Sequence, residues 1–277
     1  MTFNIKETIR KRRSVRTYDK RKIDADLRTE ILDYADSLSN PLGPKVTFKL
    51  LDKAADPKGD KLGTYGIIKG AELYIGSKIQ RAEHAPEALG YDFEKLVLFL
   101  TAKGLGTCWL GGTFNRGAFA EAMDVKDDEI FTIISPVGYI AGKMSLTEKI
   151  MRKGAGSDKR LPWDQLFFKD DFDTALTAED AGDFAEALEM VRLAPSAVNR
   201  QPWRVLMKDG AWHFYQAGIK EDDAESVQMH RIDMGIALCH FHMAAIESGL
   251  DGEFIRKEPA DVTTPQNTAY IISFVAS

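Results

Sequence analysis

The stretch APSAVNRQPW at residues 194–203 decides how this sequence is interpreted, because it leaves one regular element and enters another through two prolines. Upstream, Thr177 caps an expected helix, and downstream residues 203–208 form an expected strand. Proline restricts the backbone before it, so the turn holds the amide side chains of Asn199 and Gln201 in place. A plain helix-to-strand turn would not require serine, asparagine and glutamine together. The stretch is therefore a candidate ligand-binding turn.

The composition of the whole chain is that of an ordinary globular protein. It has 277 residues, of which 44% are hydrophobic and 29% charged, and a net charge of −5 gives no general attraction to nucleic acid or anionic lipid. Cys108 and Cys239 lack the spacing of a zinc site or a disulfide framework, so no metal is expected. The longest strongly apolar run, residues 96–100, is too short to span a membrane. Because the basic N-terminus is not followed by an apolar signal core, we expect a cytoplasmic protein.

Hydrophobic periodicity and turn residues divide the chain into helices and strands. Helices are expected from Asn4 to near Ser14, from Asp24 to 39, from Asp92 to 103, from Thr177 to 193 and in a long segment ending at 248–250. Strands are expected at 46–51, 71–77, 131–140, 203–208 and 270–275, and irregular stretches at 54–63 and 141–169.

The second half repeats the order of the first. EILDYADSLSN (residues 30–40) corresponds to EALEMVRLAPSAVN (186–199), and TAKGLG (101–106) corresponds to AAIESGL (244–250). Similar separations between the matching segments favour a tandem duplication with differences in loop length. We expect the halves, residues 1–165 and 166–277, to share one core.

Two further motifs lie in the first half. RRSVR (residues 12–16) belongs to a basic N-terminal segment, and arginines of this kind can bind phosphate oxygens in a fork. A solvated basic face or a nucleic-acid-binding arm is the alternative, although aromatic stacking residues are not interleaved with the arginines. GLGTCWLGG (104–112) supplies glycines that let a flat ligand approach the backbone, or that simply end a helix. Cys108 has no basic neighbour in the sequence, so packing is its expected role.

Together, RRSVR, APSxxNxQPW and GLGTCWLGG resemble the motifs of the nitroreductase family of FMN-dependent oxidoreductases, over nearly the whole chain. The resemblance implies an α+β sandwich of antiparallel sheet and helices, built in that family as a homodimer with FMN at the interface. This chain has the first and third motifs only in its first half and the second only in its second half. It therefore resembles the single-chain tandem nitroreductases, in which an internal duplication forms a pseudo-dimer. A monomer with one complete flavin site is expected.

The resemblance also implies which residues bind FMN. Four residues of the first motif would contact the phosphate, the ribityl chain and the pyrimidine edge: Arg12, Arg13, Ser14 and Arg16. Leu110, Gly111 and Gly112 would line the flavin ring, with Thr64 as a further polar contact. Lys159 and Arg160 would close on the phosphate, unless they form only a surface turn. The other half would contribute Pro195, Ser196, Ala197 and Asn199.

The function expected from this resemblance is transfer of a hydride from NADH or NADPH, through FMN, to a nitroaromatic, a quinone or a similar small-molecule acceptor. The cofactor does the chemistry, so no catalytic side chain is expected. A flavin-binding or flavin-sequestering protein without turnover is the alternative. A third hypothesis is nucleic-acid binding by the basic N-terminus, which predicts salt-sensitive affinity and no yellow colour.

Overall fold

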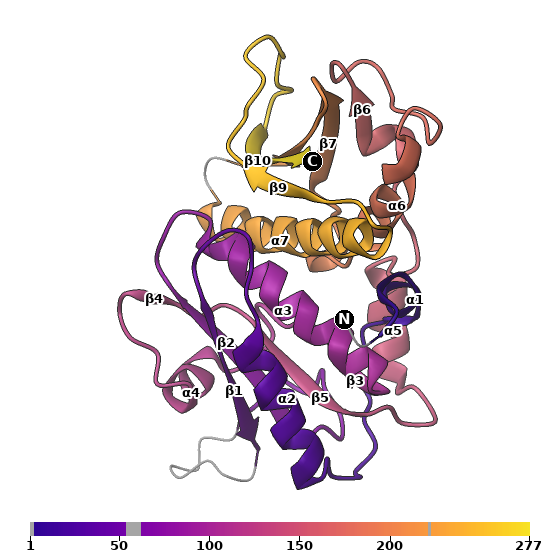
Figure 1. The fold of residues 1–277 in the computed structure, drawn as a ribbon. Helices are drawn as coiled ribbons and strands as arrows, with labels where there is room; N and C mark the ends of the chain where they lie inside the picture. The colour runs from indigo at the N-terminus through magenta and orange to yellow at the C-terminus, as the bar shows by residue number, and fades with distance from the viewer. Residues whose placement is uncertain (1–2, 54–61, 221–222) are drawn as a thin grey trace. The chain divides into compact units, whose positions relative to one another are not determined.

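The computed structural model describes residues 3–53, 62–220 and 223–277, so most of the irregular stretch expected at 54–63 lies outside the described residues. The chain forms two compact units, which we describe separately (Figure 1). Unit 1 contains Met1–Arg10 and Lys159–Ser277, and unit 2 contains Lys11–Asp158. The first ten residues therefore group with the C-terminal part of the chain. The division into halves that share one core stays a prediction.

Unit 2 combines helices with an antiparallel sheet. Its elements are α2 (Ala25–Ser37), β1 (Val46–Asp52), β2 (Leu73–Gln80), α3 (Ala85–Ala102), β3 (Leu105–Thr107), α4 (Arg116–Ala122), β4 (Glu129–Ile130), β5 (Ile134–Tyr139) and α5 (Leu146–Gly154). The strands are hydrogen-bonded in the order β1-β2-β5-β3, and β4 also pairs with β2. The β1–β2 register runs from Val46 opposite Ile79 to Asp52 opposite Leu73.

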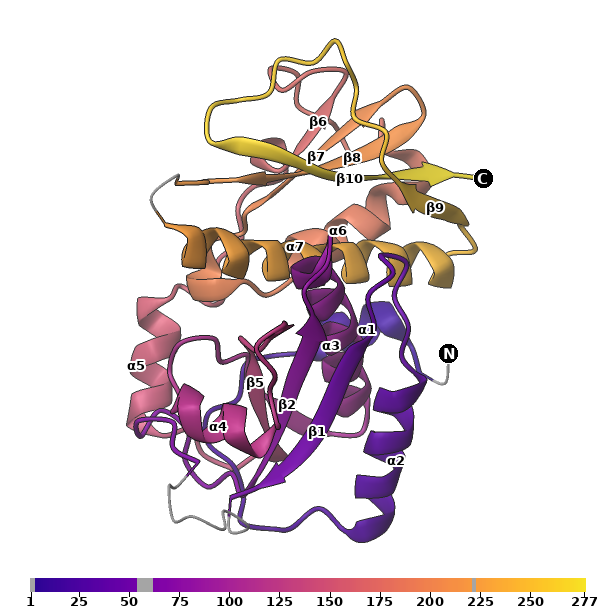
Figure 2. The same ribbon diagram turned by 90° about the vertical axis from the view of Figure 1, so that its left-hand side faces the viewer.

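The sheet of unit 2 has an apolar layer on each face (Figure 2). On one face Phe48 of β1 packs against Phe93 of α3, with ring centroids 5.6 Å apart. On the other face Tyr74 of β2 packs against Phe119 of α4, with centroids 5.3 Å apart. Successive residues of a strand point to opposite faces, so each strand supplies both layers. The layer on the α4 face also contains Val15, which places the RRSVR motif there.

The expected start of a helix at Asp92 is wrong, because α3 begins at Ala85. Pro86 and Glu87 lie in its first turn, where proline and an acidic residue both favour a helix start. Asp92 instead lies buried within the helix, and its Oδ2 accepts a hydrogen bond of 2.7 Å from Nδ2 of Asn40. Burial raises the pKa of Asp92 to about 6.

The irregular stretch expected at residues 141–169 is also wrong in part. It contains α5 and, in unit 1, strand β6 (Phe167–Lys169). The side chain of Ser145 caps α5 by accepting a hydrogen bond of 3.2 Å from the amide of Glu148. Ser145 and Glu148 have the spacing of a capping box, so this helix start could have been found in the sequence.

Unit 1 contains a second sheet with its own helices. Its elements are α1 (Ile5–Lys11, whose last residue belongs to unit 2), η1 (Trp163–Gln165), β6, η2 (Gly182–Phe184), α6 (Ala185–Leu193), η3 (Ala197–Asn199), β7 (Trp203–Lys208), β8 (Ala211–Ala217), α7 (Ala224–Glu247), β9 (Gly252–Ile255) and β10 (Thr268–Ala276). The strand order is β6-β7-β8-β10-β9, and β6 pairs with β7 in parallel while the other neighbours are antiparallel.

Aromatic side chains form the core of unit 1. Phe241 of α7 stacks on Phe184 and also contacts Phe214 of β8 and Phe274 of β10. Thr177 caps only a turn, by accepting a hydrogen bond from the amide of Asp180, so α6 starts later than expected.

Helix α1 is attached to the other helices of unit 1. The amide of Ile5 donates a hydrogen bond of 2.5 Å to Oε1 of Glu247 at the end of α7, and Arg10 pairs with Glu186 of α6. Mixed helices with largely antiparallel sheets confirm the expected α+β class, and the parallel β6 is the exception. In the described part of the chain, each helix is either too short or too polar to cross a membrane.

Candidate functional site

The RRSVR and GLGTCWLGG motifs lie side by side in unit 2. Ser14 forms a parallel bridge with Thr107 of β3, and the amide of Val15 donates a hydrogen bond of 2.8 Å to the Thr107 carbonyl. A Cβ at Gly106 would lie 3.0 Å from Cβ of Val15, so this glycine is needed for the close approach. Gly104 has a φ of +76° just after α3, as a helix C-terminus favours. These two glycines therefore have structural roles.

The arginines of the first motif differ in their surroundings. The side chain of Arg12 is only 6% exposed, and its Nε lies 3.8 Å from Oε1 of buried Glu94. Glu94 also accepts a hydrogen bond of 2.9 Å from Nε1 of Trp109 in the glycine motif. Burial lowers the pKa of Arg12, and the charge of Glu94 opposes this effect. Arg13, in contrast, is exposed.

Arg16 is the residue of this group that most clearly fits an anionic ligand. Its Nε and Nη1 are buried, and within the part of the chain that the structure describes neither has a hydrogen-bond partner. Burying a guanidinium without acceptors is costly, so an anion at this position would be favoured. The unpaired N–H donors of Arg16 suit the oxygens of a phosphate group. The residues present therefore fit the phosphate-binding role expected for this motif.

Cys108 lies close to these arginines, although it has no basic neighbour in the sequence. Burial raises the pKa of its thiol, while Arg16 and Arg12 lower it to a smaller extent. Ser14 also hydrogen-bonds to the thiol. Because burial is the largest effect, Cys108 stays a neutral thiol that packs in the core.

At the end of the glycine motif the chain leaves the sheet and its backbone becomes exposed. Leu110 is buried, and its amide and carbonyl both hydrogen-bond to Ile134. The Gly111 carbonyl accepts a hydrogen bond of 3.0 Å from Arg116. A Cβ at Gly112 would meet no described atom within 4 Å. Leu110 thus anchors the segment, and the backbone at Gly112 is accessible to a ligand.

Thr64 lies next to this segment but has a partner of its own. The carbonyl of Gly63 accepts a hydrogen bond of 2.9 Å from the amide of Asn115, which caps α4. Thr64 is buried, and its side chain hydrogen-bonds to the hydroxyl of Tyr74. The neighbouring Tyr65 is exposed and has a φ of +48°.

In unit 1 the turn at 194–203 has an unusual backbone. Val198, Asn199 and Gln201 have φ values of +43°, +58° and +52°, which are in the left-handed region. A β-branched residue such as Val198 is seldom found there, and backbone strain of this kind is typical of functional sites. Asp233 of α7 holds the turn by accepting a hydrogen bond of 3.0 Å from the amide of Ala197. The hydroxyl of Ser196 accepts one of 2.8 Å from the amide of Gln201.

The structure brings the basic pair of unit 1 to this turn. Asn199 donates a hydrogen bond of 3.0 Å from Nδ2 to the carbonyl of Lys159 and accepts one of 3.4 Å at Oδ1 from Arg160. The amide of Leu161 donates to Oε1 of Gln201 at 2.8 Å. The expected site residues of unit 1 therefore form one connected group, and Pro195, Ser196 and Ala197 lie within the same turn.

Two supporting residues were not identified from the sequence. Asp233 holds the turn and Glu94 pairs with Arg12, while Gln201 of the expected turn holds Leu161 next to the basic pair. Asp233 and Glu94 are buried acids in largely apolar helix segments, and this pattern is a usable signal, because an acid is seldom fully buried without a partner.

Comparisons with protein families and solved structures find relatives of this chain. The model of the family described as "Putative TM nitroreductase" matches residues 4–245. A crystal structure of a "putative nitroreductase" from Thermotoga maritima is 23% identical with a TM-score of 0.62, over 99% of this chain and 94% of that one. A nitroreductase with bound FMN from Bacteroides fragilis is 22% identical with a TM-score of 0.41, over 52% of this chain and 92% of that one. Among curated proteins no match was found.

Proposed function

Because this chain belongs to the nitroreductase family whose model it matches, we propose that it is an FMN-dependent oxidoreductase. The proposed reaction takes a hydride from NADH or NADPH and reduces a nitroaromatic, a quinone or a similar small acceptor. FMN, when bound, would supply the redox chemistry, and the protein would supply binding, orientation and electrostatics.

The observation that carries this proposal is the buried guanidinium of Arg16. Its Nε and Nη1 have no hydrogen-bond acceptor among the described residues, and the segment that carries it lies against β3, which is part of the glycine motif. This arrangement provides a cationic position beside an accessible backbone, as a flavin phosphate and ring would require. The fit of Arg16 to an anion does not depend on the resemblance.

The roles of the other residues follow from the resemblance and their positions. Arg12, Arg13 and Ser14 would contact the phosphate, ribityl chain and pyrimidine edge, together with Arg16. Gly111 and Gly112 would offer backbone amides to the ring, beside Leu110, and Thr64 would add a polar contact. We propose the group in unit 1, which contains Lys159, Arg160, Pro195, Ser196, Ala197 and Asn199, for the same flavin.

The order of elements in the two units supports the proposed internal duplication. In unit 2 a helix, a hairpin, a long helix and further strands give the sheet order β1-β2-β5-β3. In unit 1 the same series gives β7-β8-β10-β9. Each strand of one path has a counterpart at the same place in the other. The duplication and the resulting pseudo-dimer remain part of the proposal.

The visible absorbance spectrum of the purified protein, together with the mass of the released cofactor, tests flavin binding. Oxidation of NADH and NADPH under steady-state conditions, with and without a quinone, then tests turnover. We expect an FMN spectrum and acceptor-dependent oxidation. A protein that binds FMN but oxidises neither nucleotide would be a flavin-binding protein without turnover. A colourless protein that FMN does not stabilise would overturn the proposal.

A further inference from the structure

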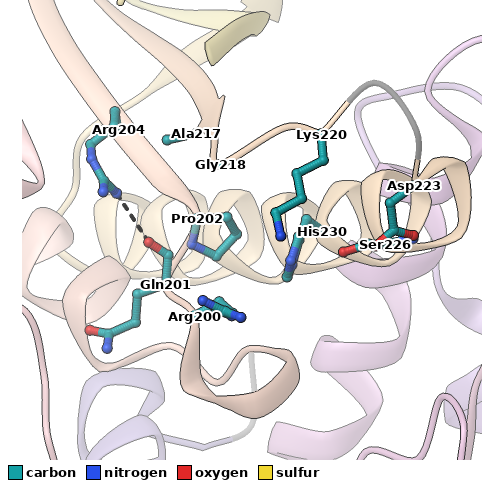
Figure 3. A pocket seen from close by; sticks show the side chains of 10 residues that line it. All are labelled: Arg200, Gln201, Pro202, Arg204, Ala217, Gly218, Lys220, Asp223, Ser226 and His230. Carbon is teal, nitrogen blue, oxygen red and sulfur yellow. Dashed lines mark hydrogen bonds between the residues drawn. The ribbon is translucent and has the colours of Figure 1, made fainter. Parts of the chain in front are cut away.

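A cavity of unit 1 carries a set of charged residues that the flavin proposal does not use. Its volume is about 300 Å³, and it lies at the start of β7, the end of β8 and the first turns of α7 (Figure 3). Three cations line it: Arg200, Arg204 and Lys220. Pro202, Ala217 and Gly218 provide small or apolar surface between them.

Arg204 is a largely buried cation without a carboxylate partner in the described part of the chain. Its Nη1 donates to the carbonyls of Gln201, at 3.1 Å, and Trp203, at 2.7 Å. Burial lowers the pKa of this guanidinium, and no acidic neighbour acts against the effect. The carbonyl groups accept hydrogen bonds from only some of the N–H groups of the guanidinium, and they do not neutralise its charge. An anion in the cavity would provide the missing charge.

Arg200 and Lys220 add two accessible cations to the same cavity. Both residues are exposed, and among the described residues neither side chain has a hydrogen bond or an ion pair. Arg200 comes from the turn before β7, and Lys220 follows β8. Figure 3 shows both side chains at the space that His230 of α7 also lines. The cavity thus has cations from separate segments.

The described lining of the cavity has more cationic than anionic side chains. Asp223 is the one acidic residue among its described lining residues, and its Oδ1 caps α7 by accepting a hydrogen bond of 3.0 Å from the amide of Ser226. Nδ1 of His230 lies 2.9 Å from Oδ2 of Asp233, so the opposite edge of the ring is left for the cavity. Among the described lining residues, three cations therefore face one acid, which favours an anionic ligand group.

We propose that this cavity binds the phosphate group of a small molecule. Two arginine forks and a lysine ammonium provide directional and point-charge contacts to phosphate oxygens. The volume is at the lower end of the range for ligand pockets, roughly 300–1,000 Å³, and suits one charged group with its neighbouring atoms. The 2′-phosphate of NADPH is one source, and this assignment rests on the proposed function. Another phosphorylated metabolite is the other source.

Titration calorimetry with inorganic phosphate tests the cavity. The full-length chain is saturated with FMN, so that phosphate cannot enter the proposed flavin site, and is titrated in a phosphate-free buffer of low ionic strength. We expect binding that Arg200→Gln weakens roughly tenfold, because the variant loses a charge-assisted hydrogen bond to the phosphate. Arg81→Gln removes the same charge from an exposed position of unit 2 and should change the affinity less than about twofold.

Competition then identifies the source of the phosphate group. If phosphate competes with NADPH and not with NADH, the cavity receives the 2′-phosphate of the nucleotide. If phosphate binds without competing, another phosphorylated molecule is the ligand. The proposal is overturned if the unaltered chain does not bind phosphate, or if Arg200→Gln and Arg81→Gln have equal effects. The titration requires no turnover, so its failure would leave the proposed oxidoreductase function intact.

Discussion

Arg12 and Arg16 are separated by three residues, yet the fold gives their charges different surroundings. Nε of Arg12 also lacks a hydrogen-bond acceptor, but it lies 3.8 Å from the carboxylate of Glu94, whereas Nε and Nη1 of Arg16 lack acceptors and Arg16 has no ion pair in the described structure. Removing Arg12 would leave Glu94 buried without its ion-pair partner and would endanger folding. Arg16 is therefore the better residue for testing the anion-binding role.

Arg16→Gln should weaken FMN binding by roughly 10- to 100-fold, because it removes one or two charge-assisted hydrogen bonds to the phosphate. Riboflavin lacks the phosphate, so its affinity should change little. Fluorescence titration of both flavins, with circular dichroism to verify folding, measures the difference. Equal weakening of FMN and riboflavin would show that Arg16 does not bind the phosphate.

Asn199 combines a polar contact with a left-handed backbone, at a φ of +58°. Asn199→Gly removes the amide but tolerates this φ, whereas Asn199→Ala adds backbone strain of about 1 kcal/mol. Both variants should weaken FMN binding, by about 1–3 kcal/mol, since they lose the amide group. Both variants also lose the hydrogen bonds to Lys159 and Arg160, and the added strain should make the alanine variant unfold more easily in urea than the glycine variant. A folded glycine variant with unchanged FMN affinity would remove Asn199 from the site.

Asp92 makes the stability of the fold depend on pH. Its pKa rises from 3.8 to about 6 on burial, so the folded state binds the proton more tightly than the unfolded state. Stability is therefore highest when Asp92 is protonated and falls as the pH increases through this interval. Asp92→Asn should raise the free energy of unfolding by about 1–3 kcal/mol above pH 7, with no gain near pH 4. Urea unfolding at both pH values, with exposed Asp36→Asn as the control, measures it.

At the scale of elements, periodicity located the long helices and several strands but not all of their boundaries. Strand β7 and the end of α7 lie where the sequence predicted them. The start of α3 was misplaced because Asp92 was interpreted as a cap, whereas it is a buried interior residue. Strand β8 was not anticipated, because it is buried along almost its whole length and lacks the alternation of a half-exposed strand.

The candidate site was predictable as motifs but not as contacts. Nothing in the sequence indicates that Val15 packs against Gly106 or that Gln201 holds Leu161, because such contacts join distant segments. For the same reason, the sequence neighbours of Cys108 did not indicate that Arg12 and Arg16 lie close to its thiol. Short motifs identify residue types suited to a ligand, and only the fold determines which of them are already used by the protein.

The capping of α5 gives a test at the element scale. Ser145→Ala removes the side-chain acceptor of the Glu148 amide and should lower the free energy of unfolding by about 1 kcal/mol. Ser145→Thr keeps a hydroxyl at the same position and should cost only a few tenths of that amount. Thermal and urea unfolding of both variants measure the difference. Equal losses in the two variants would mean that the hydroxyl does not cap the helix.

At the scale of the whole molecule, the family resemblance seen in three motifs is confirmed by the family model and its match to residues 4–245. The matching strand orders of the two units support a duplication, but their motifs differ. In the proposed duplication Asn40 of unit 2 corresponds to Asn199, and its Nδ2 donates to Asp92 and to the carbonyl of Pro44. The Asn40 amide is therefore bound to an acid, whereas that of Asn199 is bound to the basic pair Lys159 and Arg160.

The other motifs of the corresponding second site are also changed. Gly252, in the counterpart of the glycine motif, follows an aspartate, and the side chain of Asp251 accepts the hydrogen bond of the Gly252 amide, at 2.8 Å. A cluster of acids, including Asp170 and Asp171, precedes α6 where the first half has its arginines. These acids would repel a phosphate. If the duplication is as proposed, three separate changes therefore affect the same pseudo-symmetric position.

We therefore expect one FMN per chain and a chain that functions as a monomer. Because the losses affect the phosphate contact, the amide contact and the glycine segment together, restoring one of them should not restore a second site. Released FMN measured against protein concentration, combined with the mass of the protein in solution, gives the ratio. A ratio near two would contradict the single-site model. A ratio near one in a monomer supports it, and a ratio near one in a dimer would leave the single site but refute the pseudo-dimer.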